Sequence, residues 1–303
     1  MTSNYLQKAF VQKEFVNFED AKISIATQAL HYGTAAFGGL RGVINPDKID
    51  QVLLFRLPDH AKRLSQSAKF LGYDIAPDYV QSKILEFVQL NKPTSDFYIR
   101  PLVYVSSLGL APKLHNCEYD FLIYGLEMGD YFGQDIRVCF GSWVRQNDAS
   151  FPLRGKISAA YITSALAKTE AVARGFDEAI LMNSQGKVCE GTGMNIFIVR
   201  DDRIITPSVD QDILEGITRR SLITIAEKLG YTVEQRPVDK SELLIADEVF
   251  LCGTAAKVTS VKQVENFALP ANNPITKELQ MEFSRLTLGQ NSEYENWINR
   301  IDI

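Results

Sequence analysis

Residues 154–161 read RGKISAAY, and residues 190–195 read EGTGMN. The first stretch places Lys156 five residues before Tyr161, and the second begins with Glu190. An amine can form a Schiff base, a phenol can hydrogen-bond a ring hydroxyl, and a carboxylate can hold a protonated ring nitrogen; a pyridoxal phosphate site needs all three groups. Alone the set is weak evidence, because most lysines are solvated and most tyrosines fill cores. The rest of the chain has to decide.

The bulk composition indicates a globular protein with two domains. With 303 residues, the chain is long enough for two compact cores. Hydrophobic residues make up 46% and charged residues 23%, which is ordinary for a soluble protein. The net charge of −5 argues against a nucleic-acid partner. We see no secretory signal and no apolar run long enough to cross a bilayer, so no membrane partner is expected.

The cysteines give no sign of a disulfide or a metal. Cys117, Cys139, Cys189 and Cys252 lie far apart, form no CxxC pair and have no ligand-like spacing to the histidines. We therefore expect four small buried hydrophobic side chains, no metal site and a reducing, cytoplasmic location.

Helix and strand patterns follow one another without a regular βαβ rhythm, which favours an α+β fold. The stretch 127–135, with two glycines and several polar residues, is the candidate domain boundary. We expect a small α/β domain over 1–131, an interdomain loop over 132–136 and a large cofactor-binding domain over 137–303. The predicted helices are 59–71, 79–90, 157–174, 217–229 and 276–288. The predicted strands are 97–105, 121–126, 137–140, 179–182, 196–199, 203–206 and 248–252.

Three features could together bind a phosphate. Gly216, Ile217 and Thr218 begin a predicted helix, where the helix dipole and unpaired N–H groups favour an anion. The alternative is a plain helix start with a glycine near its cap. Residues 253–256, GTAA, form a second tight turn after a strand. Arg63 could supply a fixed cation, although an arginine on a helix surface is normally solvated.

Spaced motifs along nearly the whole chain resemble those of the branched-chain aminotransferases, within the fold-type IV pyridoxal phosphate enzymes. A match of this many motifs in the family's order is far more specific than any one of them. It implies a two-domain α+β fold like that of D-amino acid aminotransferase. Besides the region around Lys156, the motifs are HYGTAAFGGLRG at 31–42, FR at 55–56, HAKRL at 60–64, FYIRPL at 97–102, EGTGMNIF at 190–197, GITR at 216–219 and ADEVFLCGTAA at 246–256.

The resemblance assigns roles around pyridoxal 5'-phosphate. It implies that Lys156 holds the cofactor as a Schiff base and, once freed by the substrate amine, shuttles a proton. Tyr161 would hydrogen-bond the cofactor's phenolic oxygen, and Glu190 would pair with the ring nitrogen. The implied phosphate ligands are Arg63, the amides of Ile217 and Thr218, and Thr254.

The resemblance also assigns substrate-binding residues. Tyr98, with the amides of Thr254 and Ala255, would receive the α-carboxylate. Arg100 and Tyr32 would read the side-chain carboxylate of glutamate, with Tyr32 reaching in from a neighbouring subunit. Tyr98 and Arg100 are two apart, so on a strand both side chains lie on one face. The implied lining of the apolar side-chain pocket is Phe37, Tyr131 and Tyr161.

These roles imply an enzyme that moves the amino group of L-leucine, L-isoleucine or L-valine to 2-oxoglutarate, giving 2-oxo acids and glutamate. Its partners would be these small molecules and further copies of the chain, in a homodimer or higher homo-oligomer. On the same fold, a D-amino acid transaminase, an (R)-amine transaminase and aminodeoxychorismate lyase remain alternatives, although the Tyr-x-Arg pattern favours the branched-chain enzymes. A catalytically silent cofactor-binding protein is a further alternative, against which intact Lys156, Tyr161 and Glu190 argue.

The chain departs from the family at one position near the substrate. The family usually has Phe-Glu-Gly in the first motif, whereas this chain has Phe37-Gly38-Gly39. Two adjacent glycines loosen the backbone and remove a charge near the pocket. The departure leaves the cofactor residues intact but puts the substrate range in doubt. Met194, where some relatives carry glutamate, carries less weight because others have methionine.

Overall fold

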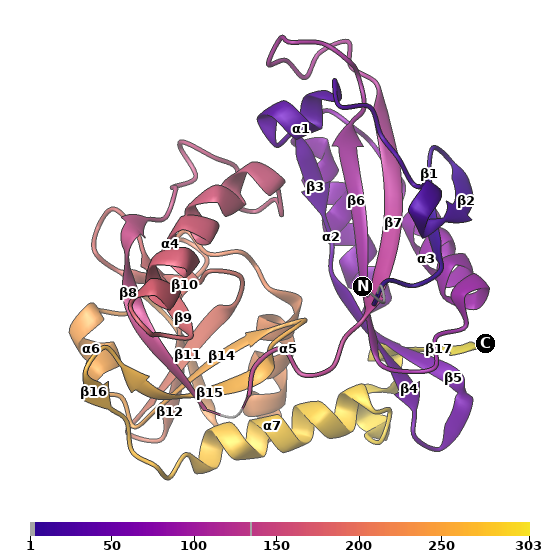
Figure 1. Cartoon of the computed structure of the whole chain (residues 1–303). Coiled ribbons are helices and arrows are strands. Elements are labelled where there is room, and N and C mark those ends of the chain that lie inside the picture. The colour runs from indigo at the N-terminus through magenta and orange to yellow at the C-terminus, as the bar shows by residue number, and fades with distance from the viewer. Residues whose placement is uncertain (1–3, 134) are drawn as a thin grey trace. The chain divides into compact units, whose positions relative to one another are not determined.

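The computed structural model of the chain describes residues 4–133 and 135–303. Gln134, in the predicted interdomain loop 132–136, and residues 1–3 of the predicted first domain lie outside the described residues. The chain forms two compact units (Figure 1). Unit 1 consists of Met1–Gly129, Gly155–Ala159 and Arg285–Ile303, and unit 2 of Asp130–Arg154 and Ala160–Ser284.

This division differs from the predicted domains in two longer segments, and Asp130 and Tyr131, predicted in the first domain, belong to unit 2. Residues 155–159, which carry Lys156, and residues 285–303 belong to unit 1, although they lie within the predicted second domain 137–303. Backbone pairing explains both. Ile157 forms an antiparallel bridge with Ala36, and the last strand, β17 (Ile298–Asp302), pairs with β5 (Lys48–Phe55) of unit 1. Such long-range pairs cannot be read from local composition.

Unit 1 is built on an antiparallel sheet in the order β17-β5-β4-β6-β7-β1-β2, with β3 also paired to β6. Helix α2 (Leu57–Lys69) contacts β3 and β6, and its apolar residues Leu57, Ala61, Leu64 and Ala68 recur at helical spacing and are buried. The other strands are β1 (Lys8–Val11), β2 (Glu14–Asn17), β3 (Ala35–Phe37), β4 (Leu40–Asn45), β6 (Phe97–Val105) and β7 (Tyr119–Glu127). The other helices are η1 (Phe18–Asp20), α1 (Gln28–Tyr32), α3 (Pro77–Asn91) and η3 (Ser292–Trp297).

Unit 2 contains a mixed sheet in the order β10-β9-β8-β15-β14-β11-β12-β13, with β16 paired to β15. The pairs β8–β9, β8–β15 and β12–β13 are parallel, and the others are antiparallel. The strands are β8 (Ile136–Val144), β9 (Glu178–Met182), β10 (Val188–Gly191), β11 (Asn195–Arg200), β12 (Arg203–Thr206), β13 (Thr232–Gln235), β14 (Glu248–Gly253), β15 (Lys257–Val264) and β16 (Phe267–Ala268). The helices are α4 (Tyr161–Ala173), α5 (Ile217–Lys228), α6 (Lys240–Leu244) and α7 (Pro274–Thr287), whose last residues belong to unit 1. The 3-10 turn η2 (Ser158–Ala160) spans the boundary, with Ser158 and Ala159 in unit 1 and Ala160 in unit 2.

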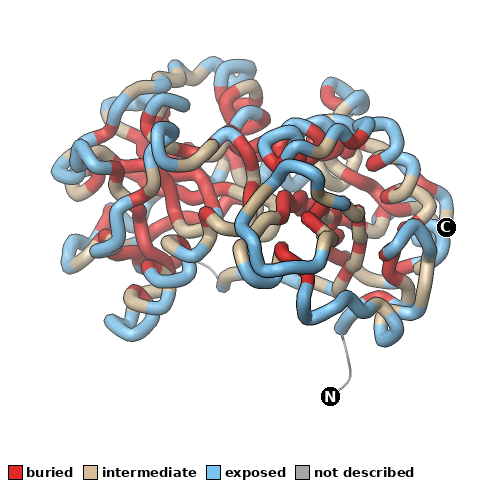
Figure 2. Tube along the Cα trace, turned by 90° about the horizontal axis from the view of Figure 1, so that it is seen from above, coloured by how far each residue is buried: buried red, intermediate tan, exposed pale blue. Residues whose placement is uncertain are grey.

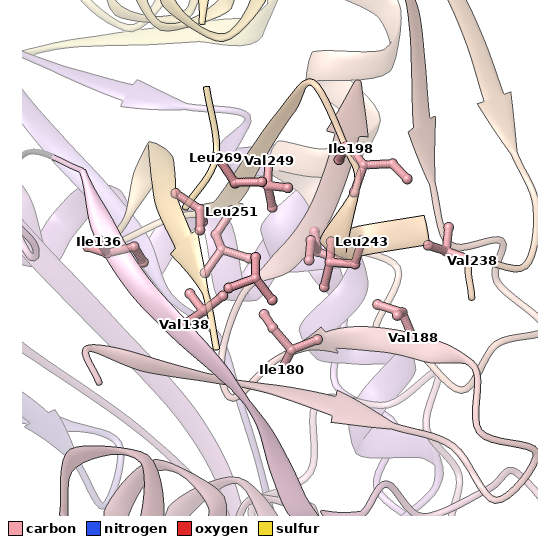
Figure 3. Close-up of a cluster of buried hydrophobic side chains, with 14 of the residues drawn as sticks. Ile136, Val138, Ile180, Val188, Ile198, Val238, Leu243, Val249, Leu251 and Leu269 are labelled. Atoms are coloured by element: carbon pink, nitrogen blue, oxygen red, sulfur yellow. The ribbon is translucent and has the colours of Figure 1, made fainter. Parts of the chain in front are cut away.

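The core of unit 2 follows from side-chain alternation along its strands. Ile136 and Val138 on β8, Ile198 on β11, and Val249 and Leu251 on β14 point into one cluster (Figure 3). Intervening positions face the other side, where Cys139, Ala179 and Leu181 pack against Ala167 and Ala171 of α4. Both faces of this sheet are therefore buried, and in Figure 2 the buried stretches alternate with exposed loops.

The α+β class is confirmed, but one predicted helix begins in the wrong place. The predicted helix 157–174 begins only at Tyr161, after the 3-10 turn η2. The reason is that Lys156 and Ile157 pair with the backbone of β3 and are not free to begin a helix. Helix α2 begins at Leu57, two residues before the predicted start, with a proline in its first turn.

Among the described residues, the longest apolar helix falls short of what a membrane span requires.

Candidate active site

Lys156 is held on both sides of its backbone by unit 1. Its carbonyl oxygen accepts a hydrogen bond from the N–H of Phe37 at 2.9 Å, and its own N–H donates to Oγ of Ser67 at 3.0 Å. Its amine, Nζ, lies 4.9 Å from the centroid of the Phe37 ring. A cation over a ring face is attracted by the ring quadrupole. The lysine is therefore fixed at its backbone, with its amine next to an aromatic surface.

Ser67 connects this lysine to Arg63. The hydroxyl of Ser67 accepts from the N–H of Lys156 and donates to the carbonyl oxygen of Arg63, 2.8 Å away, one turn earlier on α2. Ser67 is fully buried, and Arg63 is partly buried. The predicted Schiff-base lysine and the predicted phosphate arginine thus share one buried hydroxyl. Ser67 was not predicted, although its position four residues after Arg63 on the same helix was a usable signal.

Tyr98 and Arg100 lie on one face of β6, as their spacing predicts. Nη2 of Arg100 donates to the hydroxyl oxygen of Tyr98 at 3.2 Å. The guanidinium carbon lies 4.6 Å from the centroid of the Phe37 ring and 5.1 Å from that of Tyr98. Burial raises the pKa of Tyr98, an effect that the positive charge of Arg100 only partly offsets. The tyrosine is therefore a neutral hydrogen-bond donor at physiological pH.

Gly39 makes room for this arrangement. A Cβ atom at Gly39 would lie 1.8 Å from the hydroxyl of Tyr98, so that any larger residue would displace the phenol. At Gly38, where the family usually has glutamate, a Cβ atom would lie 2.8 Å from Cγ of Pro101. A side chain at position 38 would therefore need a small shift of the proline ring, whereas one at position 39 has no room.

Tyr32, the last residue of α1, is partly exposed, and its hydroxyl donates to the carbonyl oxygen of Leu110 in the loop between β6 and β7. This contact places it on a loop surface of unit 1. The predicted site residues in unit 1 are Tyr32, Phe37, Arg63, Tyr98, Arg100 and Lys156.

In unit 2, Glu190 is the centre of a buried polar network. Nη2 of Arg145 lies 2.7 Å from its Oε1 atom, and both side chains are 7% exposed. Its Oε2 atom accepts from Nδ2 of Asn195 at 2.9 Å and from the N–H of Leu214 at 3.1 Å. Hydrogen bonds and an adjacent cation favour the ionised carboxylate. Glu190 can therefore serve as the fixed anion that a protonated ring nitrogen requires.

Arg145 and Asn195 were not predicted. Asn195 belongs to the motif at 190–197, so its position there was a signal that we did not use. No feature of the sequence singled out Arg145, because an arginine after a strand usually reaches solvent. Its Nε atom donates to the carbonyl oxygen of Asp212 at 3.1 Å, which keeps the guanidinium within the unit.

The first turn of α5 carries Ile217 and Thr218, both buried. Its N-cap residue is Gly216, which has no side chain with which to cap the first turn. The first N–H groups of an α-helix have no partner within the helix, and its dipole favours an anion there. This geometry fits the predicted phosphate position.

The other predicted residues of unit 2 lie on turns and at a helix start. Thr254 and Ala255 are partly buried in the turn between β14 and β15, and Tyr161 is the first residue of α4. Tyr131 is 51% exposed, with its ring 4.7 Å edge-on from that of Phe132. The predicted site residues in unit 2 are Tyr131, Tyr161, Glu190, Ile217, Thr218, Thr254 and Ala255. Among residues 4–133 and 135–303, no three His, Cys, Asp or Glu side chains gather where they could hold a metal ion.

The family model for the class IV amino-transferases matches residues 45–264. A probable branched-chain-amino-acid aminotransferase from Synechocystis sp. (strain ATCC 27184 / PCC 6803 / Kazusa) is 61% identical over 300 residues, which cover 99% of this chain and 98% of the relative. The chain belongs to the class IV aminotransferases. The family resemblance of the motifs is thereby confirmed.

Solved structures of class IV aminotransferases match over nearly the whole chain. The branched-chain aminotransferase from Thermoproteus uzoniensis with norvaline has a TM-score of 0.94 and 34% identity, covering 97% of this chain and 99% of that one. The branched-chain amino acid aminotransferase from Thermobaculum terrenum in its PLP-bound holo form has a TM-score of 0.93 and 32% identity, covering 99% of this chain and 100% of that one. The predicted fold type, aminotransferase class and dependence on pyridoxal phosphate are confirmed.

Proposed function

We propose that this class IV aminotransferase transfers the amino group of L-leucine, L-isoleucine or L-valine to 2-oxoglutarate. One observation carries the proposal. The guanidinium of Arg100 lies against the ring faces of Phe37 and Tyr98, so that one surface offers both apolar area and a positive charge. Such a surface can take an aliphatic side chain, and it can take the carboxylate of glutamate when the arginine engages it. A transaminase of this kind needs both modes.

The residues present fit pyridoxal phosphate. We assign Lys156 as its attachment point, Glu190 as the partner of its ring nitrogen and Tyr161 as the partner of its phenolic oxygen. The bound cofactor supplies an electron-accepting ring next to the substrate Cα. The proposed phosphate ligands are Arg63, the amides of Ile217 and Thr218, and Thr254. The buried, cation-paired state of Glu190 supports the assignment at the ring nitrogen, and the glycine N-cap of α5 supports the phosphate position because no side chain at residue 216 stands before the first amides.

The amine of Lys156 is proposed to move the proton at the substrate Cα. The two backbone hydrogen bonds of Lys156 hold its Cα in place, so that only the flexible side chain has to move. A positioned base of this kind typically contributes ~10²–10⁴ to the rate.

The substrate α-carboxylate is assigned to the hydroxyl of Tyr98 and the amides of Thr254 and Ala255. Because burial raises the pKa of Tyr98, its hydroxyl keeps its proton and can donate to the carboxylate. The lining proposed for the substrate side chain is Phe37, Tyr131 and Tyr161, with Arg100 and Tyr32 reading a side-chain carboxylate.

A panel of half-reactions tests the proposal. The pyridoxal phosphate form is mixed with L-leucine, L-isoleucine, L-valine, L-glutamate, D-alanine, D-glutamate and (R)-1-phenylethylamine, and the loss of its visible absorbance band is followed. We expect the four L-amino acids to react at least about tenfold faster than the others, a difference of ~1.4 kcal/mol in activation free energy. A faster reaction with the D-amino acids or the amine would contradict the proposed substrates. It would mean that the departure at Gly38, and not the Tyr-x-Arg pattern, indicates the substrate class.

We also propose that two copies of the chain form a dimer. Ile25, Leu30, Leu108 and Leu110 are 85%, 65%, 62% and 81% exposed. They lie on two segments that are distant in sequence and are brought side by side by a bridge between Thr27 and Leu108. Contiguous exposed apolar area usually marks an interface. Tyr32, bonded to Leu110 on this surface, would then reach the site of the second copy.

Light scattering on the purified chain tests this surface. We expect a dimer for the parent and for Ile49→Asp, which alters a side chain that is 83% exposed elsewhere in unit 1. Leu110→Asp should give monomer, whereas a monomeric parent would contradict the proposal.

We also propose a cytoplasmic location, which is supported by four cysteines that are all free.

A further inference from the structure

Asn195, at the start of β11, contacts two segments that are distant in sequence. Its Nδ2 atom donates both to Oε2 of Glu190 and to the carbonyl oxygen of Leu214, each at 2.9 Å. Asn195 is 6% exposed, so bulk water has little access to these donors. One amide group therefore ties the carboxylate of Glu190 to the chain just before α5.

The backbone of Leu214 completes the connection. Its N–H donates to the same Oε2 atom of Glu190 at 3.1 Å, while its carbonyl oxygen accepts from Asn195. Glu190, Asn195 and Leu214 therefore form a closed set of hydrogen bonds. Arg145, 2.7 Å from the other carboxylate oxygen, fixes the rotation of the Glu190 side chain.

A third contact extends this set to the helix itself. A Cβ atom at Gly216, the N-cap residue of α5, would lie 2.0 Å from Oδ1 of Asn195. The backbone of Gly216 has φ −66° and ψ 136°, which any residue can adopt. Glycine is therefore needed at position 216 for the close approach of Asn195, and not for its conformational freedom.

We propose that Asn195 is a positioning residue that holds Glu190 and the first turn of α5 at a fixed separation. The inference rests on the proposed roles of Glu190 at the ring nitrogen and of the Ile217 and Thr218 amides at the phosphate. One rigid ligand must meet both groups at once, so an error in their spacing weakens both contacts. Holding the two groups together before the ligand arrives removes that cost from binding.

If Asn195 couples the two groups, a substitution at one group should weaken a probe that contacts only the other group. We call this a cross effect. Pyridoxal lacks the phosphate and probes the ring end, whereas inorganic phosphate probes the other end. In the full-length apoprotein, Gly216→Ala should weaken pyridoxal, and Glu190→Gln should weaken inorganic phosphate. We expect about tenfold in each dissociation constant, or ~1.4 kcal/mol. Asn195→Ala should weaken both probes and abolish the two cross effects when it is combined with either variant.

Matched variants separate positioning from simple loss of stability. Asn45, also a buried asparagine, uses its side chain to bond Gln51 and the N–H of Asp47 in a hairpin of unit 1. Asn45→Ala should lower the midpoint of thermal unfolding without changing either dissociation constant. If Asn195→Ala does not fold, the cross effects of Gly216→Ala and Glu190→Gln alone decide. Their absence would overturn the coupling.

Two direct effects report on the proposed roles themselves. Ile217→Pro, which removes one of the two amides at the first position of α5, where proline is tolerated, should weaken inorganic phosphate, and Glu190→Gln should weaken pyridoxal. Loss of these direct effects would overturn the proposed roles and the coupling with them. If each probe responds only to the substitution at its own end, the proposed function is retained and only the coupling is overturned.

Discussion

The N–H of Phe37 donates to the carbonyl oxygen of Lys156, and the centroid of the Phe37 ring lies 4.9 Å from the amine of the same lysine. One residue of β3 therefore holds both the backbone and the reactive end of the proposed catalytic lysine. The hydrogen bond does not depend on the lysine side chain, so that side chain can be removed without loosening its segment.

Lys156→Ala should accordingly abolish transamination and leave the fold intact. We expect turnover to fall by at least ~10²–10⁴ through loss of the base, while the midpoint of thermal unfolding changes little. Lys187→Ala is the control, because the amine of Lys187 pairs with the exposed carboxylate of Asp239. An alanine variant at 156 that kept both turnover and the visible absorbance of bound cofactor would refute the assignment.

Two serines on α2 offer a comparison within one helix. Ser67→Ala removes the acceptor for the N–H of Lys156 and should cost about 1 kcal/mol of stability, with weaker binding of pyridoxal phosphate. Ser65 is equally buried, but its hydroxyl has no partner among residues 4–133 and 135–303. Ser65→Ala should therefore be neutral or slightly stabilising. Similar effects of the two variants on cofactor affinity, measured by titration of the apoprotein, would show that Ser67 does not position the lysine.

Arg145 changes what is expected of Glu190→Gln. The substitution would leave a 7% exposed guanidinium without its carboxylate, so it should destabilise the protein by about 3–5 kcal/mol as well as slow turnover. Adding Arg145→Met should restore much of the stability and none of the turnover. Thermal unfolding and single-turnover absorbance measure the two effects separately. Recovery of turnover in the double variant would mean that the carboxylate does not act on the cofactor.

Tyr98 and Arg100 should affect substrates differently. Arg100→Ala should slow the half-reaction with glutamate by about tenfold or more, as expected for a lost charged contact of ~1.5–3 kcal/mol, and should affect leucine much less. Tyr98→Phe should affect both substrates, because the α-carboxylate is common to them. Equal losses for both substrates in Arg100→Ala would contradict dual recognition.

The raised pKa of Tyr98 gives a pH dependence with a definite sign. A hydroxyl whose pKa lies above the ordinary value of 10.0 keeps its proton as the pH rises to that value. Binding of leucine should therefore show no loss due to Tyr98 below about pH 10. The pH profile of kcat/KM for the parent, compared with that of Tyr98→Phe, checks this. A decline near pH 8 that is absent from the phenylalanine variant would show that the phenol ionises earlier.

Local patterns predicted β6 at its observed bounds, because residues 97–105 are rich in the aromatic and branched side chains that strands favour. They also predicted that Tyr98 and Arg100 share a face. The helix start at 157 was wrong, because the pairing of Ile157 with Ala36 overrides the helical propensity of the small residues that follow. Arg145 could not have been found, since its partner Glu190 lies 45 residues away and an ion pair leaves no periodic signal.

The path of the backbone between the units limits how this enzyme can be dissected. The chain passes from one unit to the other after Gly129, Arg154, Ala159 and Ser284. No single cut therefore releases either unit as a continuous polypeptide. A fragment starting at 137 would carry Lys156 without β3 and β17 without β5, leaving both segments without their partners. From this connectivity we expect neither half to fold when it is expressed alone, and recombination between relatives should succeed only where all four crossings come from the same parent.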